Sequence, residues 1–334
     1  MIIHMLQAGA GDCFVIDFEN GKCVLIDGGI PETYSDSLKP LLQRLNSEGK
    51  CIENLICTHF DNDHIGGLLK FVTNNGDYKQ PCIIRVEHII CNHFEEAEKI
   101  LSTYYYSGTR DISYHQQQTF EELCSKNHYP MPAFPITENT IIKGTGYSLR
   151  FVAPSQSALD RCKEAVAPEQ PTNERNSISA TIYDDIEHWK SIPPTSSGLN
   201  VFNKASLAFE LITSNRMLLF CGDADMNTYR DNLHESYDLI KLSHHGTYHG
   251  NECFIGKDPI IADKYIISTS STRYYHPERP LLAGVLLQRR HKEIILNYNL
   301  FYMPTRGYRL LDNSEQQVKY NFSATVQDRI EIGD

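Results

Sequence analysis

Residues 58–67, THFDNDHIGG, place four side chains that can bind a metal ion within six positions: His59, Asp61, Asp63 and His64. The apolar run NLIC precedes them, which predicts a buried strand that leads into a loop. On such a strand His59, Asp61 and Asp63 would project to one side by the period of two. Two carboxylates and two imidazoles this close would repel or stay unpaired unless a cation offsets them. The stretch therefore predicts part of a metal site, and the alternative is an exposed polar loop with chance spacing.

Three further polar clusters each follow an apolar run. Asp223 ends LLFCGD, His244 and His245 lie in LIKLSHHGT, and His276 ends IISTSSTRYYHP. Alone, His276 would more readily be a surface or hydrogen-bonded histidine. Because α/β proteins build their sites at strand ends, the clusters together predict one shared site.

The elements that would position these clusters form two β-then-α halves. The first half contains a hairpin of CFVIDF and KCVLIDGG joined at ENGK, a helix over 36–47, the strand ENLICTHF and the helix GGLLKFVTN. In that half, Gly66 and Gly67 would let the backbone pass close to the site before the helix begins. From residue 205 the pattern predicts strands in ASLAFELIT, RMLLFCGDAD, LIKLSHHG, KYIISTS, EIILNYN, GYRLL and VKYNF. Helices are predicted in YRDNLHESY and RPLLAGVLLQRRH. This alternation indicates an α/β protein.

The middle of the chain differs in character. HFEEAEKILSTYYY and DISYHQQQTFEELCSKN predict helices, and residues 155–200 are rich in Pro, Ser and Asn. Strand patterns resume on both sides, so we interpret about 90–200 as a helical and irregular insertion over the site. The whole of 1–334 is then expected to be a single domain.

Composition excludes several classes of protein. The formal net charge of −11 argues against a broad basic face for non-specific nucleic-acid binding. Ten cysteines without a CxxC pair predict free thiols in a reducing compartment. No stretch approaches the roughly 18 apolar residues of a spanning helix. We therefore expect a cytoplasmic protein with no membrane partner.

The motifs THFDNDHIGG, GDAD, KLSHHGT and YYHP resemble those of the metallo-β-lactamase superfamily. They are most similar to the metallo-β-lactamase-like domain of the ComEC/Rec2 competence proteins, which carries HxDxDHxGG, then GD, HHGS and a late HP. The opening AGAGDCFVIDFENGKCVLIDGG is similar to that domain's GxGD, hairpin and IDGG. The resemblance covers most of residues 1–300 apart from the insertion. It implies an αβ/βα four-layer sandwich with a two-metal site between its sheets.

The resemblance also implies roles for the motif residues. His59 and Asp61 would hold the first metal ion. Asp63 and His64 would hold the second, and Asp223 would bridge both.

Two further sets of residues would complete the site. One histidine of the pair His244 and His245 would bind the second ion and the other would face substrate, because neighbours on a strand point to opposite faces. The sequence does not say which. Asp27 of LIDGG would orient a ligand histidine by a hydrogen bond, with a turn aspartate as the alternative. Asp12 of GAGD is a candidate for the same task.

The chain departs from the superfamily's commoner HxHxDH pattern in two ways. Asp61 replaces a histidine, which favours Mn²⁺ or Mg²⁺ over Zn²⁺ in the first site. No histidine between the second motif and Asp223 has the setting of the ligand that usually falls there. Three histidines lie in that interval: His88, His93 and His188. Asn203 or water would fill the gap, so we expect two divalent ions, Zn²⁺ or Mn²⁺, with the occupancy of the second left open.

The expected chemistry is hydrolysis. Bound ions would activate a water for attack on an ester and stabilise the developing charge. Asp63 would accept the proton of that water, and His245 or His276 would donate a hydrogen bond or proton to the oxyanion. Arg273 and Tyr275 would suit a phosphate contact, with a solvated loop as the alternative.

These features favour a hydrolase that cleaves phosphodiester bonds, specifically a nuclease acting on DNA or RNA. The acidic net charge suggests a partner protein that delivers the nucleic acid. The alternative is a hydrolase of a small ester, lactone, thioester or choline phosphodiester. A third hypothesis is a non-enzymatic scaffold, against which the intact ligand set argues.

Overall fold

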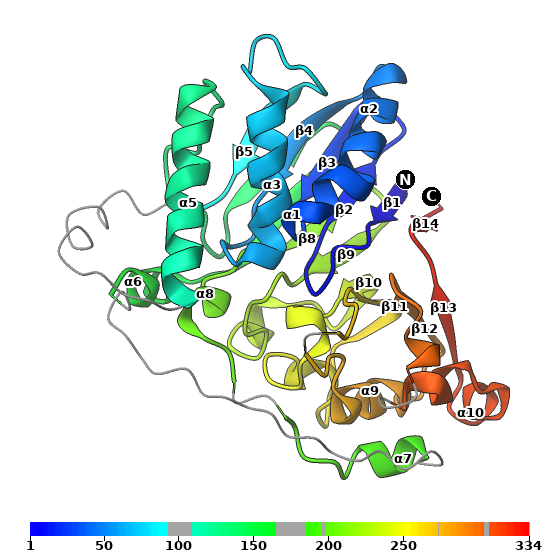
Figure 1. Ribbon diagram of the computed structural model, residues 1–334. Coiled ribbons are helices and arrows are strands. Elements are labelled where there is room, and N and C mark those ends of the chain that lie inside the picture. The colour runs from blue at the N-terminus through cyan, green and yellow to red at the C-terminus, as the bar shows by residue number, and fades with distance from the viewer. Residues whose placement is uncertain (93–108, 165–184, 196–197, 273, 304–306, 334) are drawn as a thin grey trace.

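The computed structural model describes residues 1–92, 109–164, 185–195, 198–272, 274–303 and 307–333, and Figure 1 labels its elements. Two β-sheets organise these residues. The first has the order β14-β1-β2-β3-β4-β5, antiparallel from β14 to β3 and parallel from β3 to β5. Its strands are β1 Ile2–Met5, β2 Phe14–Asp17, β3 Lys22–Ile26, β4 Cys51–Ile56, β5 Val86–Ile90 and β14 Arg329–Glu331. The two ends of the chain therefore lie side by side at β1 and β14 (Figure 1).

The second sheet has the order β13-β12-β11-β10-β9-β8-β7-β6. Pairing is antiparallel from β6 to β9 and parallel from β9 to β13. Its strands are β6 Ile141–Gly144, β7 Tyr147–Ala153, β8 Ala208–Ile212, β9 Met217–Phe220, β10 Ser236–Lys241, β11 Ile261–Ile267, β12 Lys292–Leu296 and β13 Phe322–Val326. The inner strand β9, MLLF, is a continuous apolar run, as expected for a strand covered on both faces.

Helices cover the outer face of each sheet. The α-helices of the described residues are α1 Pro31–Thr33, α2 Lys39–Ser47, α3 Asn62–Asn75, α5 Thr109–Lys126, α6 Gln156–Glu164, α7 Ile186–Trp189, α8 Val201–Lys204, α9 Arg279–Leu286 and α10 Ser314–Lys319. Phe71 of α3 packs on the first sheet, and Trp189 of α7 and Leu282 of α9 pack on the second. Between the sheets, the rings of Phe14 and Phe220 meet edge to face at 5.8 Å. The order helix, sheet, sheet, helix confirms the αβ/βα sandwich.

The predicted hairpin and the first buried strand are confirmed. Strands β2 and β3 pair with Phe14 opposite Ile26, and ENLI forms most of β4. The helix predicted over 36–47 is also present, but it begins earlier, at α1, and passes through a π-helical turn, Tyr34–Leu38, before α2.

Three predicted elements in the second half were wrong. YRDNLHESY forms only a 3₁₀ turn, Arg230–Asn232, because neighbouring side chains bind the backbone that a helix would use. Arg150 donates to the Asn232 carbonyl, and the amide of His234 donates to the Tyr237 hydroxyl.

GYRLL and VKYNF were also assigned incorrectly. GYRLL forms a 3₁₀ turn, Tyr308–Asp312, after Gly307 adopts a left-handed conformation. VKYNF splits into the end of α10 and the start of β13, because Asn313 caps a helix by accepting from the amides of Glu315 and Gln316.

The middle of the chain contributes to both sheets. In the range of the expected insertion, β6 and β7 join the second sheet beside β8, and α5 packs on the first sheet. The helix predicted in DISYHQQQTFEELCSKN is confirmed by α5. The helix predicted in HFEEAEKILSTYYY lies outside the described residues. The single domain and the bounds of the insertion remain predictions.

Two expectations from composition concern cysteines and membranes. All ten cysteines are free, and only Cys82 is exposed. Within the described ranges, no helix has the length and apolarity to cross a membrane.

Helix α3 begins earlier than predicted, and this changes the setting of the first motif. Strand β4 ends at Ile56, and α3 begins at Asn62, so Asp63 and His64 lie in the first turn of a helix and not on a strand. The strand alternation assumed for residues 59–63 was therefore wrong.

Gly67 allows this helix to approach the turn after β3. A Cβ atom at Gly67 would lie 1.9 Å from the carbonyl oxygen of Gly28. The amide of Gly28 donates directly to the carbonyl oxygen of His64 at 2.7 Å, so the two backbones are in contact. Glycine is thus retained inside a helix, where it is otherwise unfavourable, because only a bare backbone fits.

We predict that Gly67→Ala lowers the free energy of unfolding by at least about 2 kcal/mol, because the added methyl group must displace backbone. Urea unfolding would measure this loss. The control is Gly256→Ala, whose Cβ would meet only an ordinary contact at 3.5 Å. Equal stability of the two variants would contradict the close approach of α3 to Gly28.

Candidate metal centre

The polar clusters of the sequence converge at one end of the two sheets. His59 lies in the loop between β4 and α3, and His64 lies in the first turn of α3. Asp223 follows β9, and His244 and His245 follow β10. The predicted shared site is thus assembled from segments of both sheets.

The carboxylate of Asp223 stands at its centre. Its Oδ2 atom lies 3.6 Å from Nε2 of His59, 3.5 Å from that of His64, 3.8 Å from that of His244 and 3.7 Å from that of His245. These separations exceed those of ordinary hydrogen bonds. Two atoms that bind one ion at about 2.0–2.2 Å lie roughly 3.0–3.5 Å apart, which is close to what is observed.

Buried polar atoms around Asp223 also fit a bound cation. Among the described residues, five buried atoms of the site have no hydrogen-bond partner: His59 Nε2, His244 Nδ1, Asp12 Oδ1, Asn203 Oδ1 and Asp223 Oδ1. Each such atom costs about 1–3 kcal/mol when it is left unsatisfied. A metal ion would remove the cost for those that face it, so the side chains fit the group that the motifs imply.

Hydrogen bonds from outside the cluster fix the orientation of the imidazoles. Asp27 Oδ2 lies 2.8 Å from Nδ1 of His64, and Asp27 also accepts from the amide and hydroxyl of Thr58, each at 2.7 Å. Nδ1 of His245 lies 3.0 Å from the carbonyl oxygen of Ser268. These contacts leave Nε2 of both rings free to face Asp223, which is how proteins orient metal-binding histidines. The place predicted for Asp27, beside a histidine of the motif, is what the structure shows.

The pKa of His64 follows from the same contacts. Burial lowers it, but the carboxylates of Asp223 and Asp27 outweigh burial and raise the pKa well above its usual value. For Asp223, burial raises the pKa, and the surrounding histidines outweigh it and hold the pKa well below its usual value.

The two neighbouring histidines do not lie on a strand. Strand β10 ends at Lys241, and His244 and His245 have left-handed backbone angles, φ 45° and 57°, inside a 3₁₀ turn. Both imidazoles therefore reach Asp223. We expected strand alternation to point one of them away from the metal site, and that expectation was wrong. His245 is buried, whereas the side chain of His244 is a quarter exposed.

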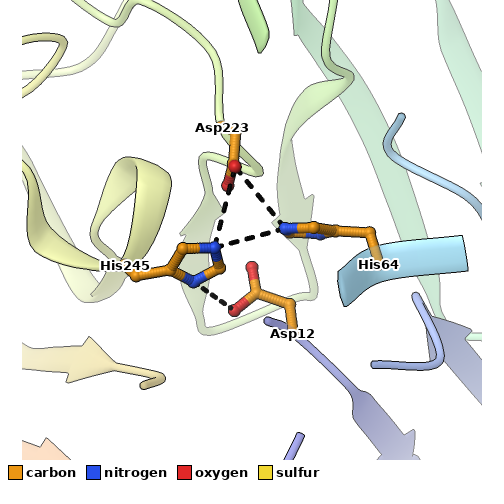
Figure 2. A group of neighbouring side chains, drawn as sticks. All are labelled: Asp12, His64, Asp223 and His245. Atoms are coloured by element: carbon orange, nitrogen blue, oxygen red, sulfur yellow. Dashed lines mark hydrogen bonds and ion pairs between the residues drawn. The ribbon is translucent and has the colours of Figure 1, made fainter. Parts of the chain in front are cut away.

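The remaining aspartates of the motifs flank this cluster. Asp61 Oδ2 lies 3.7 Å from His59 Nε2, and Asp63 Oδ2 lies 3.7 Å from His245 Nε2. Asp12 Oδ1 lies 3.5 Å from His245 Nδ1. Figure 2 shows Asp12 and Asp223 on opposite sides of the His245 ring, with His64 pointing from α3 toward Asp223 and His245. Asp12, His64, Asp223 and His245 each offer a ligand atom within 4.8 Å of the others.

His276 and its neighbours lie at the edge of the centre. The His276 ring centroid is 5.6 Å from that of His244, and the ring of Tyr274 stacks on it at 5.6 Å. Tyr274 and Tyr275 are partly exposed. Arg273, predicted to contact phosphate, lies outside the described residues.

An asparagine lies at the place where the ligand pattern has its gap. His88 and His188 are exposed, on β5 and α7, and His93 lies outside the described residues. Asn203 is buried, and its Nδ2 lies 3.2 Å from His244 Nε2 and 3.5 Å from Asp223 Oδ2. Of the two candidates for the gap, Asn203 is therefore in place.

Comparison with known proteins agrees with these motifs. Residues 6–114, which include THFDNDHIGG, match the family model described as the metallo-beta-lactamase superfamily. The match covers about a third of the chain and shows that this part is similar to the superfamily. The two sheets and their outer helices have the metallo-β-lactamase fold. No curated protein matches the chain.

Solved structures with distant likeness include three proteins. The metallo-beta-lactamase fold protein YhfI from Bacillus subtilis is 11% identical, with 99% of this chain and 100% of that chain covered and a TM-score of 0.39. Zn²⁺-bound PqqB from Methylobacterium extorquens is 8% identical, with 99% and 100% covered and a TM-score of 0.43. CmlA, a diiron β-hydroxylase from Streptomyces venezuelae, is 11% identical, with 98% and 53% covered and a TM-score of 0.42. No activity is carried over from likeness this remote.

Lys241 also belongs to the centre, although it was not among the site residues predicted from the sequence. Its side chain is buried, forms an ion pair with Asp12, lies 3.9 Å from Asp223 Oδ1 and donates to the Gly222 carbonyl at 3.0 Å. Burial lowers the pKa of Lys241, but the carboxylates of Asp12 and Asp223 outweigh it and raise the pKa. The position of this lysine inside the apolar run LIKL could have indicated its role, since a buried lysine needs a carboxylate partner.

We predict that Asp27→Asn weakens metal binding about 10- to 100-fold, because the amide lacks the charge that makes His64 Nε2 more basic. Isothermal titration of metal-stripped protein with Zn²⁺ or Mn²⁺ would measure the change. Asp36→Asn, at an exposed position, is the control. Unchanged affinity in folded Asp27→Asn protein would contradict the orienting role of Asp27.

Proposed function

We propose that this protein is a metal-dependent phosphodiesterase, a nuclease acting on DNA or RNA. The observation that carries the proposal is the position of Asp223 Oδ2, within 3.5–3.8 Å of four imidazole nitrogens. A carboxylate that lies close to four potential ligand nitrogens suits a bridge between two ions. Paired divalent ions suit in-line displacement at phosphorus, where both the attacking and leaving oxygens carry charge.

The charges of the site support two divalent ions. One buried ammonium, that of Lys241, lies among the carboxylates. Two divalent ions add four positive charges to it, which together offset five carboxylates. The described site contains that many: Asp12, Asp27, Asp61, Asp63 and Asp223.

The ligand atoms divide into two sides. His64, His245 and Asp63 would hold one ion, with Asp223 as the bridge. His59 and Asp61 would hold the other, beside His244. Because Asp61 replaces a nitrogen ligand with a hard oxygen, the side of His59 and Asp61 favours Mn²⁺ over Zn²⁺.

The ions would supply Lewis acidity that activates water and stabilises charge on phosphoryl oxygens. Asp63, about a fifth exposed, would accept the proton of the attacking water. His276, beside His244 at the rim, would donate a proton or hydrogen bond to the leaving oxygen, and the stacked Tyr274 ring would limit its rotation. Tyr275, partly exposed next to it, would contact the phosphate.

The choice of nucleic acid rests on the sequence motifs. Their similarity to the metallo-β-lactamase domain of the ComEC-like competence proteins supports a nucleic-acid substrate. The net charge of −11 opposes long-range attraction of a polyanion. We therefore propose that a partner protein delivers the nucleic acid to this site.

Hydrolysis of bis-p-nitrophenyl phosphate tests the proposal. Metal-stripped protein should be inactive and should regain turnover with Mn²⁺, with less activity in Zn²⁺. Asp223→Asn should lose at least about 100-fold in rate, because the shared ligand is weakened. Asp225→Asn, two residues along in GDAD, is the matched control and should retain activity.

Single-stranded and duplex DNA and RNA would then be compared as substrates. Protein that binds metal but shows no turnover on the chromogenic diester or on nucleic acid would contradict the phosphodiesterase proposal.

A further inference from the structure

We infer that Asn203 is itself a metal ligand, through its side-chain amide oxygen, on the His59 side of the centre. The inference rests on the metal centre of the proposed function and does not depend on the substrate. Asn203 would take the place of the histidine that the commoner motif pattern of the superfamily has between the second motif and Asp223.

The buried amide of Asn203 is only half satisfied by the protein. The residue is 2% exposed, and its Oδ1 atom has no hydrogen-bond partner among the described residues. Its Nδ2 atom makes a 3.2 Å contact with His244 Nε2 and a long 3.5 Å contact with Asp223 Oδ2. A half-turn about the last side-chain bond exchanges the amide oxygen and nitrogen. When His244 Nε2 carries no proton, as it must to bind a metal, an oxygen turned this way faces two acceptors, and that is favourable only if a cation lies among them.

Local structure fixes Asn203 firmly at this place. Asn200 caps helix α8 by accepting from the Asn203 amide at 2.9 Å. Just after the helix, the Ser206 hydroxyl accepts from the Asp223 amide at 3.1 Å and lies 3.4 Å from His59 Nδ1. The turn that carries Asn203 is thus tied to the two loops that carry His59 and Asp223. A side chain held in this way loses little entropy when it binds an ion.

The consequence is a centre with two unlike sides. Around His59 the candidate ligands include three oxygens, those of Asp61, Asn203 and Asp223. The other side has two imidazoles, those of His64 and His245, beside the oxygens of Asp63 and the shared Asp223. Oxygen ligands favour Mn²⁺ and Mg²⁺, and imidazole suits Zn²⁺. Asn203 would therefore set which metal the His59 side prefers.

Titration of metal-stripped protein with Mn²⁺ and with Zn²⁺ tests this inference without any measurement of activity. Asn203→Leu removes the oxygen and should weaken one Mn²⁺ binding event at least about 10-fold. Asn203→Asp keeps an oxygen and adds charge, so it should bind Mn²⁺ at least as tightly as wild type. Asn203→His should shift the ratio of the two affinities toward Zn²⁺ by at least about 10-fold.

Asn54→Leu is the matched control. Asn54 is also buried, with an Oδ1 atom that lacks a hydrogen-bond partner, but its Nδ2 donates to Tyr147 away from the centre. Its Mn²⁺ affinity should equal that of wild type. Mn²⁺ affinities within twofold of wild type in folded Asn203→Leu, or an unshifted metal preference in Asn203→His, would overturn the inference. These outcomes hold whether or not the protein hydrolyses phosphodiesters.

Discussion

The buried carboxylate of Asp223 is the constraint on which the rest of this structure depends. It is 1% exposed, and a carboxylate removed from water without compensation is very unfavourable. The fold surrounds it with imidazoles from both halves of the chain, His59 and His64 from the first sheet's side and His244 and His245 from the second's. The four histidine nitrogens lie too far from the carboxylate for ordinary hydrogen bonds, so they stabilise it poorly by themselves. Their arrangement suits the binding of a metal ion. The centre is therefore the point at which the two halves are joined chemically as well as by packing.

Bringing the ligands to Asp223 requires unusual backbone around it. Asp27, His244 and His245 all have positive φ angles, which cost free energy for residues other than glycine. Helix α3 approaches so closely that Gly67 touches the carbonyl of Gly28. Such conformations persist where surrounding contacts over-determine them, and here those contacts are the hydrogen bonds of Asp27 and the ion pair of Lys241 with Asp12. Strain and buried charge are thus concentrated at the centre, where bound ions would offset them.

Much of this arrangement could be predicted from the sequence, because its signals are local. Crowded ligands at 59–64, the GD of Asp223 and the pair 244–245 all follow apolar runs, and the strand ends do bring them together. What could not be predicted depends on partners distant in the chain. Lys241 has meaning only beside Asp12, and the left-handed turn at His244 has no local signature, so strand alternation was the wrong basis for that pair. Asn203 could be named only as one way to fill a gap, since its orphaned oxygen and its contact with His244 appear only in three dimensions.

We propose that Asp223 is shared by two divalent ions. Anomalous diffraction from a crystal of the protein loaded with Mn²⁺, recorded on both sides of the manganese absorption edge, tests it most directly. We expect two anomalous peaks flanking the Asp223 carboxylate, one beside His64 and His245 and one beside His59. A loaded crystal with no peak within bonding distance of Asp223, or with a single fully occupied ion that does not contact it, would contradict the sharing of Asp223 by two ions.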